Sequence, residues 1–317
     1  MLMLWVVFPI FAQFFYTSGG YIENYLTDLA LPKKRAGALI LGRIPSFLIT
    51  MLLLFAVFGR AVFILPLGNA LGLILAGAIN IFGSIFYFKA LQIGDAADIN
   101  IFGQLSPLIT LILGIIILGE TMSLSQGAGL VLIMLAAAVV IFGGKKQKRS
   151  QPHNGKVIAL VIASAFFSNL SDVVFAFFIK GFTSDLTLLG QSLFFFELGS
   201  ALMVVILMIC LESWRRAVRT TFFTGKKHSR NMVALITDNI AFTLAELLYK
   251  YGLLVVPVIA IMSAIGKVAS LFISFFFTVF LGRIFPKFIH GKRVTRRVLV
   301  QYIIASVLIV AGVIVMN

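Results

Sequence analysis

Long apolar runs, separated by short polar segments, follow one another along the whole sequence. Each run has about twenty residues, the length at which an α-helix crosses the hydrocarbon core of a bilayer. The pattern predicts an all-α, polytopic membrane protein with ten transmembrane helices, at residues 2–18, 35–58, 62–88, 96–118, 125–143, 157–180, 187–211, 231–254, 257–282 and 298–316.

One of these runs, residues 96–118, differs from a helix that faces lipid on all sides. It carries Gln104, Ser106 and Pro107 near its middle. Lipid offers no hydrogen-bond partner to polar side chains, or to a carbonyl group that a proline leaves free. We therefore expect this segment to pack on a partner helix or to line a solvated pathway.

The composition agrees with a membrane protein. Hydrophobic residues make up 61% of the chain and charged residues 12%, whereas soluble domains are roughly half apolar and about a quarter charged. The mean hydropathy is +1.09. We attribute the net charge of +15 to membrane topology rather than to nucleic-acid binding. The expected partners are therefore a lipid bilayer and a small-molecule substrate, with no nucleic acid.

Residues suited to catalysis or metal binding are scarce. The chain has a single cysteine, Cys210, and its three histidines, His153, His228 and His290, all fall in basic loops. No span contains an acidic or histidine pair at the spacing of a metal site, and no phosphate-binding loop for ATP is present. We expect no enzymatic activity, no metal and no cofactor.

Basic residues predict the orientation of the chain. Most of the 26 Lys and Arg residues lie in the loops that follow the odd-numbered spans, whereas Arg60, Lys180 and Lys250 fall on the opposite side. Loops rich in Lys and Arg stay in the cytoplasm. Ten spans with cytoplasmic basic loops place both termini outside the cytoplasm.

A basic loop at residues 144–156 divides the chain into two units, residues 1–143 and 157–317. Each unit has five predicted spans. Because five is odd, a duplicated unit would enter the membrane in opposite senses, which is typical of inverted-repeat transporters. The segment Phe102-Gly103-Gln104 occupies the same place in the first unit as Ile265-Gly266-Lys267 in the second.

Short motifs of the first unit resemble the repeat of the drug/metabolite transporter superfamily, of the EamA-like kind. The motifs are Ala90-Leu91, Ala96-Ala97, Leu105-Ser106-Pro107-Leu108, Leu118-Gly119-Glu120 and the glycines Gly127 and Gly129. The second unit is degenerate, since Val268-Ala269 stands where Ser-Pro is expected.

This resemblance implies two inverted five-helix repeats around a central cavity. Spans 1, 3 and 4 of one repeat and spans 6, 8 and 9 of the other would line that cavity. We expect an integral, multi-pass protein of a bacterial inner membrane. The resemblance also implies cytoplasmic termini, which conflicts with the charge distribution; we follow the charge distribution, because it is a physical property of this chain.

Ionisable residues inside the spans are candidate functional residues, because each costs insertion free energy. Lys267 lies deepest, and two interpretations of it stay open. It either serves a substrate or a proton, or it forms a structural pair with Asp172, Glu246 or Asp238. A polar stripe around Asp172 lies on one helical face, which predicts either cavity lining or hydrogen bonding between helices.

Two further charged residues have less specific interpretations. Arg43 precedes a proline near the start of its span, and it either extends to the membrane interface or offers a cation to an anionic group. Glu197 falls in a span that the resemblance places at the periphery, so we expect a structural pair there.

The remaining candidates are Gln13 and Tyr16 in the first span, Asn80 and Tyr87 on one face of the third span, Gln104 at the position equivalent to Lys267, and Asn239 on about one face with Glu246. The predicted substrate-binding residues are Gln13, Tyr16, Asn80, Tyr87, Gln104, Asn169, Asp172, Asn239, Glu246 and Lys267. Asp172 and Glu246 are also the candidates for carrying a coupling proton.

The sequence thus predicts a secondary transporter that moves a small polar organic metabolite by alternating access, coupled to protons. The carboxylates outnumber Lys267, which favours an amino acid or an amine as substrate. One alternative is a transporter of phosphate- or carboxylate-bearing metabolites, held by Lys267 and Arg43. A second is a non-transporting membrane protein, such as a lipid scramblase or an assembly factor. The sequence does not decide between a monomer and a homodimer.

Overall fold

The computed structural model of the chain describes residues 4–25, 43–93, 103, 105–143, 155–179, 186–212, 215, 228–256, 258–284 and 296–316. Within these residues the fold is all-helical, with ten α-helices and one short 3-10 helix, as the sequence predicted. The elements are α1 (Leu4–Tyr25), α3 (Ile44–Phe58), η2 (Gly59–Phe63), α4 (Leu67–Ile93), α6 (Ser106–Leu118), α7 (Leu124–Gly143), α8 (Gly155–Ile179), α9 (Leu186–Cys210), α11 (His228–Val255), α12 (Ile259–Ile284) and α13 (Arg296–Met316).

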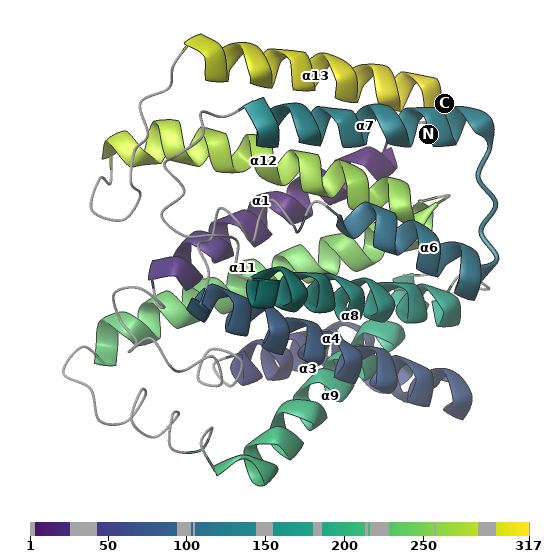
Figure 1. Ribbon diagram of the computed structural model, residues 1–317. Helices are drawn as coiled ribbons and strands as arrows, with labels where there is room; N and C mark the ends of the chain where they lie inside the picture. Colours follow the sequence, from purple (N-terminus) through teal and green to yellow (C-terminus); the bar gives the residue numbers. More distant parts are fainter. Residues whose placement is uncertain are drawn as a thin grey trace.

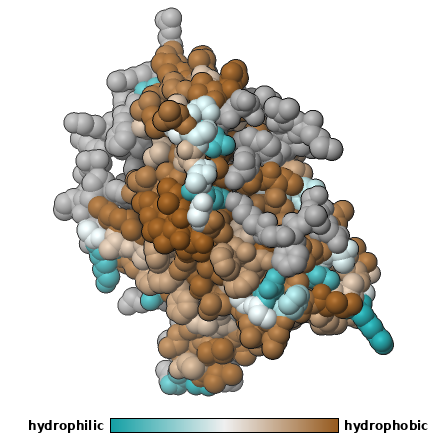
Figure 2. Space-filling model, turned by 90° about the vertical axis from the view of Figure 1, so that its right-hand side faces the viewer, coloured by the Kyte–Doolittle hydropathy of each residue, from teal (hydrophilic) through white to brown (hydrophobic). Residues whose placement is uncertain are grey.

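The helices form a bundle whose outer surface is apolar. Five described segments are long and apolar enough to cross a membrane; they are Ile44–Phe63, Leu67–Ile93, Gly155–Ile179, Leu186–Cys210 and Ile259–Phe277. Large apolar side chains remain exposed on the outside, for example Val57 and Ile116. Hydrophobic residues dominate the face drawn in Figure 2. This surface suits contact with lipid, and the chain is a polytopic membrane protein.

The helix pairs repeat between the two units. Helix α1 packs on α11 and α12 in the same way as α8 packs on α4 and α6. The pairs α3–α9, α6–α12 and α7–α13 each join helices at equivalent positions of the two units, and α7 and α13 lie side by side at one edge (Figure 1). Each of these contacts between a helix of the first unit and a helix of the second therefore has a counterpart in which the two units are exchanged. The opposite insertion of the two units into a membrane stays a prediction.

Both ends of the chain lie at the same end of the bundle (Figure 1). An even number of crossings requires this arrangement. It is compatible with termini on either side of a membrane, so the outside location of the termini stays a prediction as well.

The Leu118-Gly119-Glu120 motif ends one helix and supports the start of another. Gly119 closes α6 with a left-handed φ of 63°, a conformation that favours glycine. The backbone N–H of Glu120 then donates to the carbonyl group of Gly114 at 3.2 Å. The side chain of Glu120 accepts a hydrogen bond from the N–H of Ile259, the first residue of α12, at 3.4 Å. A carboxylate at a helix N-terminus is favourable, so the motif joins the two units.

Pro107 does not interrupt a helix in this structure. We expected Ser106 and Pro107 near the middle of a span, but α6 begins at Ser106, and Pro107 falls in its first turn. Proline is well tolerated there, because the first N–H groups of a helix have no partner within the helix. Gln104 and residues 96–102 of the predicted span lie outside the described residues.

Candidate functional site

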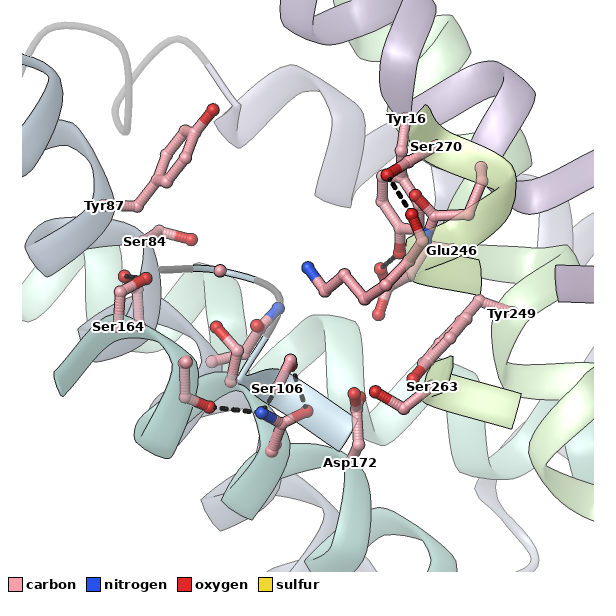
Figure 3. Close-up of a pocket in the computed structure, with 18 of the residues that line it drawn as sticks. Tyr16, Ser84, Tyr87, Ser106, Ser164, Asp172, Glu246, Tyr249, Ser263 and Ser270 are labelled. Carbon is pink, nitrogen blue, oxygen red and sulfur yellow. Dashed lines mark hydrogen bonds between the residues drawn. The ribbon is translucent and has the colours of Figure 1, made fainter. Parts of the chain in front are cut away.

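A polar cavity of about 310 Å³ lies between the two units. Its described lining comes mainly from α1, α4 and α6 of the first unit and from α8, α11 and α12 of the second. These are the six helices for which the resemblance implied a cavity. Ser84, Tyr87 and Ser164 lie on one side of the space, opposite Tyr16, Glu246 and Tyr249 (Figure 3).

Most of the predicted site residues meet in this cavity. Eight of the ten line it, namely Gln13, Tyr16, Asn80, Tyr87, Asn169, Asp172, Glu246 and Lys267. Their convergence follows from the cost of polar side chains in lipid, which turns them toward the interior of the bundle. Gln104 lies outside the described residues, so its position is not compared.

Asn239 is the one described candidate that does not line the cavity. It is buried two turns before Glu246 on α11, where α11 contacts α3. The hydroxyl group of Ser46 on α3 donates to the backbone carbonyl of Asn239 at 3.3 Å and lies 2.8 Å from the hydroxyl of Thr243. This part of α11 is therefore turned to a neighbouring helix. Asn239 and Glu246 share a predicted face of α11, but they lie at different positions along the helix axis and do not belong to the same site.

The centre of the charged cluster is Lys250 on α11. Its Nζ lies 2.6 Å from Oδ1 of Asp172 on α8 and 3.5 Å from Oε1 of Glu246. The hydroxyl group of Tyr16 on α1 donates to the other oxygen of Glu246. The cluster therefore connects three helices from both units at the wall of the cavity.

Our assignment of Lys250 to the loops was wrong. The residue is 0% exposed, and its side chain is among the largest fully buried ones of the described residues. Its position four residues after Glu246 was the available indication, because residues at this spacing on a helix are neighbours. Sequence reasoning also missed Tyr249 and several small serines of the lining, which are Ser84, Ser263 and Ser270.

Lys267 has a different environment from Lys250. It lines the cavity from α12 and is only partly buried. Among the described residues, no carboxylate lies within ion-pair distance of it. The structural pair with Asp172, Glu246 or Asp238, one of the two interpretations, is not found among the described residues; Lys250 lies within ion-pair distance of Asp172 and Glu246 instead. Lys267 thus offers an uncompensated ammonium group to whatever fills the cavity.

Arg43 lies at the end of the cavity where α3 begins. Its guanidinium pairs with Glu23 of α1, and it stacks over the ring of Phe242 at 4.0 Å and the ring of Phe88 at 5.5 Å. Its side chain is 12% exposed, and its place relative to a membrane interface stays a prediction. Because its charge is already paired, Arg43 is a weaker anchor for an anionic group than Lys267.

Glu197 is more deeply placed than the resemblance suggested. It is 2% exposed on α9, and its Oε2 has no hydrogen-bond partner among the described residues. The expected structural ion pair is not found among those residues. The neighbouring Phe196 places its ring 4.2 Å from Nζ of Lys250, so Glu197 lies behind the charged cluster rather than at its surface.

Asn169 lines the cavity, but its amide is already occupied. Its Oδ1 accepts hydrogen bonds from Ser106 at 3.0 Å and from Thr110 at 2.8 Å, both on α6. Its Nδ2 donates to the carbonyl group of Ala165 at 2.7 Å. This arrangement supports hydrogen bonding between α6 and α8 as the main role of Asn169.

We expect Asn169→Leu to lower the stability of the protein by about 1–3 kcal/mol, because the buried hydroxyl group of Ser106 loses its acceptor, and that of Thr110 keeps only the carbonyl group of Ser106. Thermal unfolding in detergent measures the change. Asn69→Leu is the matched control, since Asn69 makes a single long hydrogen bond of 3.4 Å to the carbonyl group of Phe178. Equal melting temperatures for the two variants would show that the α6–α8 connection carries little stability.

The described residues contain no group of three or more His, Cys, Asp or Glu side chains that could hold a metal ion. The lining offers ionic and hydrogen-bonding recognition. Its groups include the ammonium group of Lys267, the paired guanidinium of Arg43, the two carboxylates beside Lys250, and the hydroxyl groups of tyrosine and serine.

Comparisons with known proteins agree with this architecture. Residues 34–142 match the EamA-like transporter family. No curated protein matches the chain. A solved structure described only as the crystal structure of a protein shares the fold over 99% of this chain and 96% of its own, with a TM-score of 0.66 and 16% sequence identity. It is one of 27 chains of solved structures that match. The resemblance to EamA-like transporters is thereby confirmed.

Proposed function

From the match of residues 34–142 to the EamA-like transporter family, we infer that the protein is a membrane transporter of this kind, with a finer function. The protein is a secondary transporter of small polar organic metabolites that carry a carboxylate or a phosphate group. The observation that carries this proposal is the uncompensated ammonium of Lys267 in the cavity wall.

The charges that the structure places at the cavity differ from those that the sequence predicted. Asp172 and Glu246 outnumber Lys267 as lining residues, which favoured an amine. The Nζ atom of Lys250 lies 2.6 Å and 3.5 Å from these two carboxylates, so its charge offsets one of the two carboxylate charges. An amine would therefore compete with Lys250 for the carboxylates. An anion would instead meet the ammonium group of Lys267, which has no ion-pair partner among the described residues. An amino acid remains a candidate through its carboxylate.

The surroundings of Lys267 suit a small polar anion. Ser263 and Ser270 line the same cavity from α12, four residues before and three residues after Lys267. These spacings place them on one helical face with Lys267. Hydroxyl groups beside an ammonium supply additional donors for a carboxylate or a phosphate. A volume of about 310 Å³ lies at the small end of the range for ligand sites, so the substrate is a small metabolite.

Alternating access and proton coupling complete the proposal. The cavity lies at the interface of the two units, where a rocking motion of one unit against the other would expose it to each side in turn. Proton uptake by Asp172 or Glu246 would weaken their attraction to Lys250 and so loosen the contact between α8 and α11. We place the protein in a bacterial inner membrane with its basic loops in the cytoplasm; accessibility of tags on each terminus in intact cells tests this orientation.

The substrate class is tested on the purified protein. Ligands stabilise the state that they bind, so carboxylates and phosphate esters should raise the melting temperature more than amines of the same size. Uptake of the stabilising compound into liposomes, with and without a proton gradient, then tests transport and coupling. Stabilisation by amines alone contradicts the substrate class. Liposomes that scramble lipid but accumulate no solute contradict transport.

A further inference from the structure

Lys250 lies behind the carboxylates that face the cavity. The side chain of Lys250 is 1% exposed, whereas those of Asp172 and Glu246 are 17% and 7% exposed. Asp172 and Glu246 line the cavity and Lys250 does not. A molecule in the cavity therefore meets two carboxylates that share one ammonium group on the side away from the cavity.

The ammonium group of Lys250 has no route to solvent. Aromatic rings cover its other sides, with Nζ 4.7 Å from the ring centroid of Phe175 and 4.2 Å from that of Phe196. Buried charges need partners, and the carboxylates of Asp172 and Glu246 are the ones within ion-pair distance among the described residues. This enclosure keeps the ammonium at the carboxylates whether or not the cavity is filled.

We propose that Lys250 is a specificity-determining residue, a fixed internal counter-ion that makes the cavity accept anions and reject cations. The inference rests on the proposed function and concerns the same cavity. With Lys250 in place, Asp172, Glu246, Lys250 and Lys267 carry no net charge together, and Lys267 is the ammonium group that faces the cavity. Without Lys250, Asp172 and Glu246 form an uncompensated pair at the cavity wall, and a cation from the cavity is the group that fits between them.

The size of the effect follows from Coulomb's law. One charge acting on a ligand charge at roughly 8 Å, at an effective dielectric constant of about 20, changes affinity about thirtyfold. The change has opposite signs for an anion and for a cation. The preference for one over the other should therefore shift by far more than tenfold between the wild type and a variant that lacks Lys250.

The test uses probes that differ only in charge. Hydroxybutyrate and aminobutanol carry a carboxylate or an ammonium on the same hydroxylated chain, and glycerol phosphate adds a phosphate. The full-length protein in detergent is titrated with each probe, and the shift in melting temperature is measured. The wild type should be stabilised by hydroxybutyrate or glycerol phosphate, whereas Lys250→Met should be stabilised by aminobutanol.

Two further variants separate charge selection from a purely structural ion pair. Lys250→Met/Asp172→Asn removes the ion pair but restores the charge balance, so it should regain the preference for anions. Asp172→Asn alone leaves an additional positive charge and should bind anions more tightly than the wild type, by several-fold. It also decides the question if Lys250→Met does not fold.

The outcomes distinguish this inference from the proposed function. A wild type that prefers anions, together with a folded Lys250→Met that keeps this preference, overturns the role of Lys250 and leaves the substrate class standing. Unchanged anion binding by Asp172→Asn also overturns it. A wild type that prefers aminobutanol contradicts the substrate class itself.

Discussion

Lys267→Gln is expected to reduce the binding and transport of an anionic substrate by about 30-fold or more. Removing one partner of a buried, hydrogen-bonded charge pair costs about 2–5 kcal/mol, and 2 kcal/mol corresponds to roughly a 30-fold loss of affinity. Lys267 has no ion-pair partner among the described residues. The substrate would therefore be the partner that the substitution removes.

The same substitution should leave the empty protein as stable as the wild type, or more stable. In the empty protein the ammonium group of Lys267 has no ion-pair partner among the described residues, and partial burial of such a charge lowers stability. Replacing it with a neutral side chain removes this unfavourable free energy. Flux into liposomes and the melting temperature without ligand measure the two effects separately. A loss of transport that accompanies a large drop in melting temperature would indicate a structural role instead.

Two variants serve as controls for Lys267→Gln. Lys267→Arg keeps the charge and should retain a large part of the anion binding. Lys89→Gln removes a charge from an exposed position on α4, outside the cavity lining, and should leave transport unchanged. If Lys89→Gln and Lys267→Gln behave alike, the effect is one of overall charge and not of the cavity.

Gly77→Ala and Gly199→Ala should each destabilise the fold strongly. A Cβ atom at Gly77 would stand 2.0 Å from the backbone oxygen of Phe196, and one at Gly199 would stand 2.0 Å from that of Ile74. These contacts lie where α4 crosses α9, and backbone atoms cannot turn aside as the end of a flexible side chain can. Small residues allow such close approach of helices in membranes.

The expected cost is about 1–3 kcal/mol or more for each variant, since overpacking forces the backbone to shift. Gly20→Ala in α1 is the matched control, because a Cβ there meets nothing within 4 Å. Alanine is the better helix former by about 1 kcal/mol, so this control should be slightly stabilised. Melting temperatures in detergent compare the three variants. Equal values for Gly77→Ala and Gly20→Ala would contradict the close crossing.

The positions of the helices could be predicted because a bilayer imposes a length and a polarity on each segment. Backbone groups in hydrocarbon must be satisfied within the segment, so each apolar run of about twenty residues becomes a helix. The membership of Asp172, Glu246 and Lys267 in one cavity was predictable for a related reason. Ionisable side chains in spans turn away from lipid, and the interior of the bundle is the place that remains.

The partners of these side chains could not be predicted. Asp172 and Lys250 are separated by 78 positions in the chain, and their contact depends on the rotation and height of α8 and α11 against each other. A rotation of one residue moves a side chain by about 100° around a helix. The same uncertainty explains Asn239, which shares a predicted face with Glu246 but lies at the contact with α3.

The sequence by itself thus determined a polytopic, all-helical membrane protein, a resemblance to EamA-like transporters, and most of the polar residues that it places in the cavity. Hydrophobic length and the cost of charge in lipid act on each segment alone, and both can be read from residues in order. The tertiary structure decided that Lys250 lies within ion-pair distance of both carboxylates, whereas Lys267 has no ion-pair partner among the described residues. An ion pair depends on distances of a few ångströms between separate helices, and these exist only once the helices have packed.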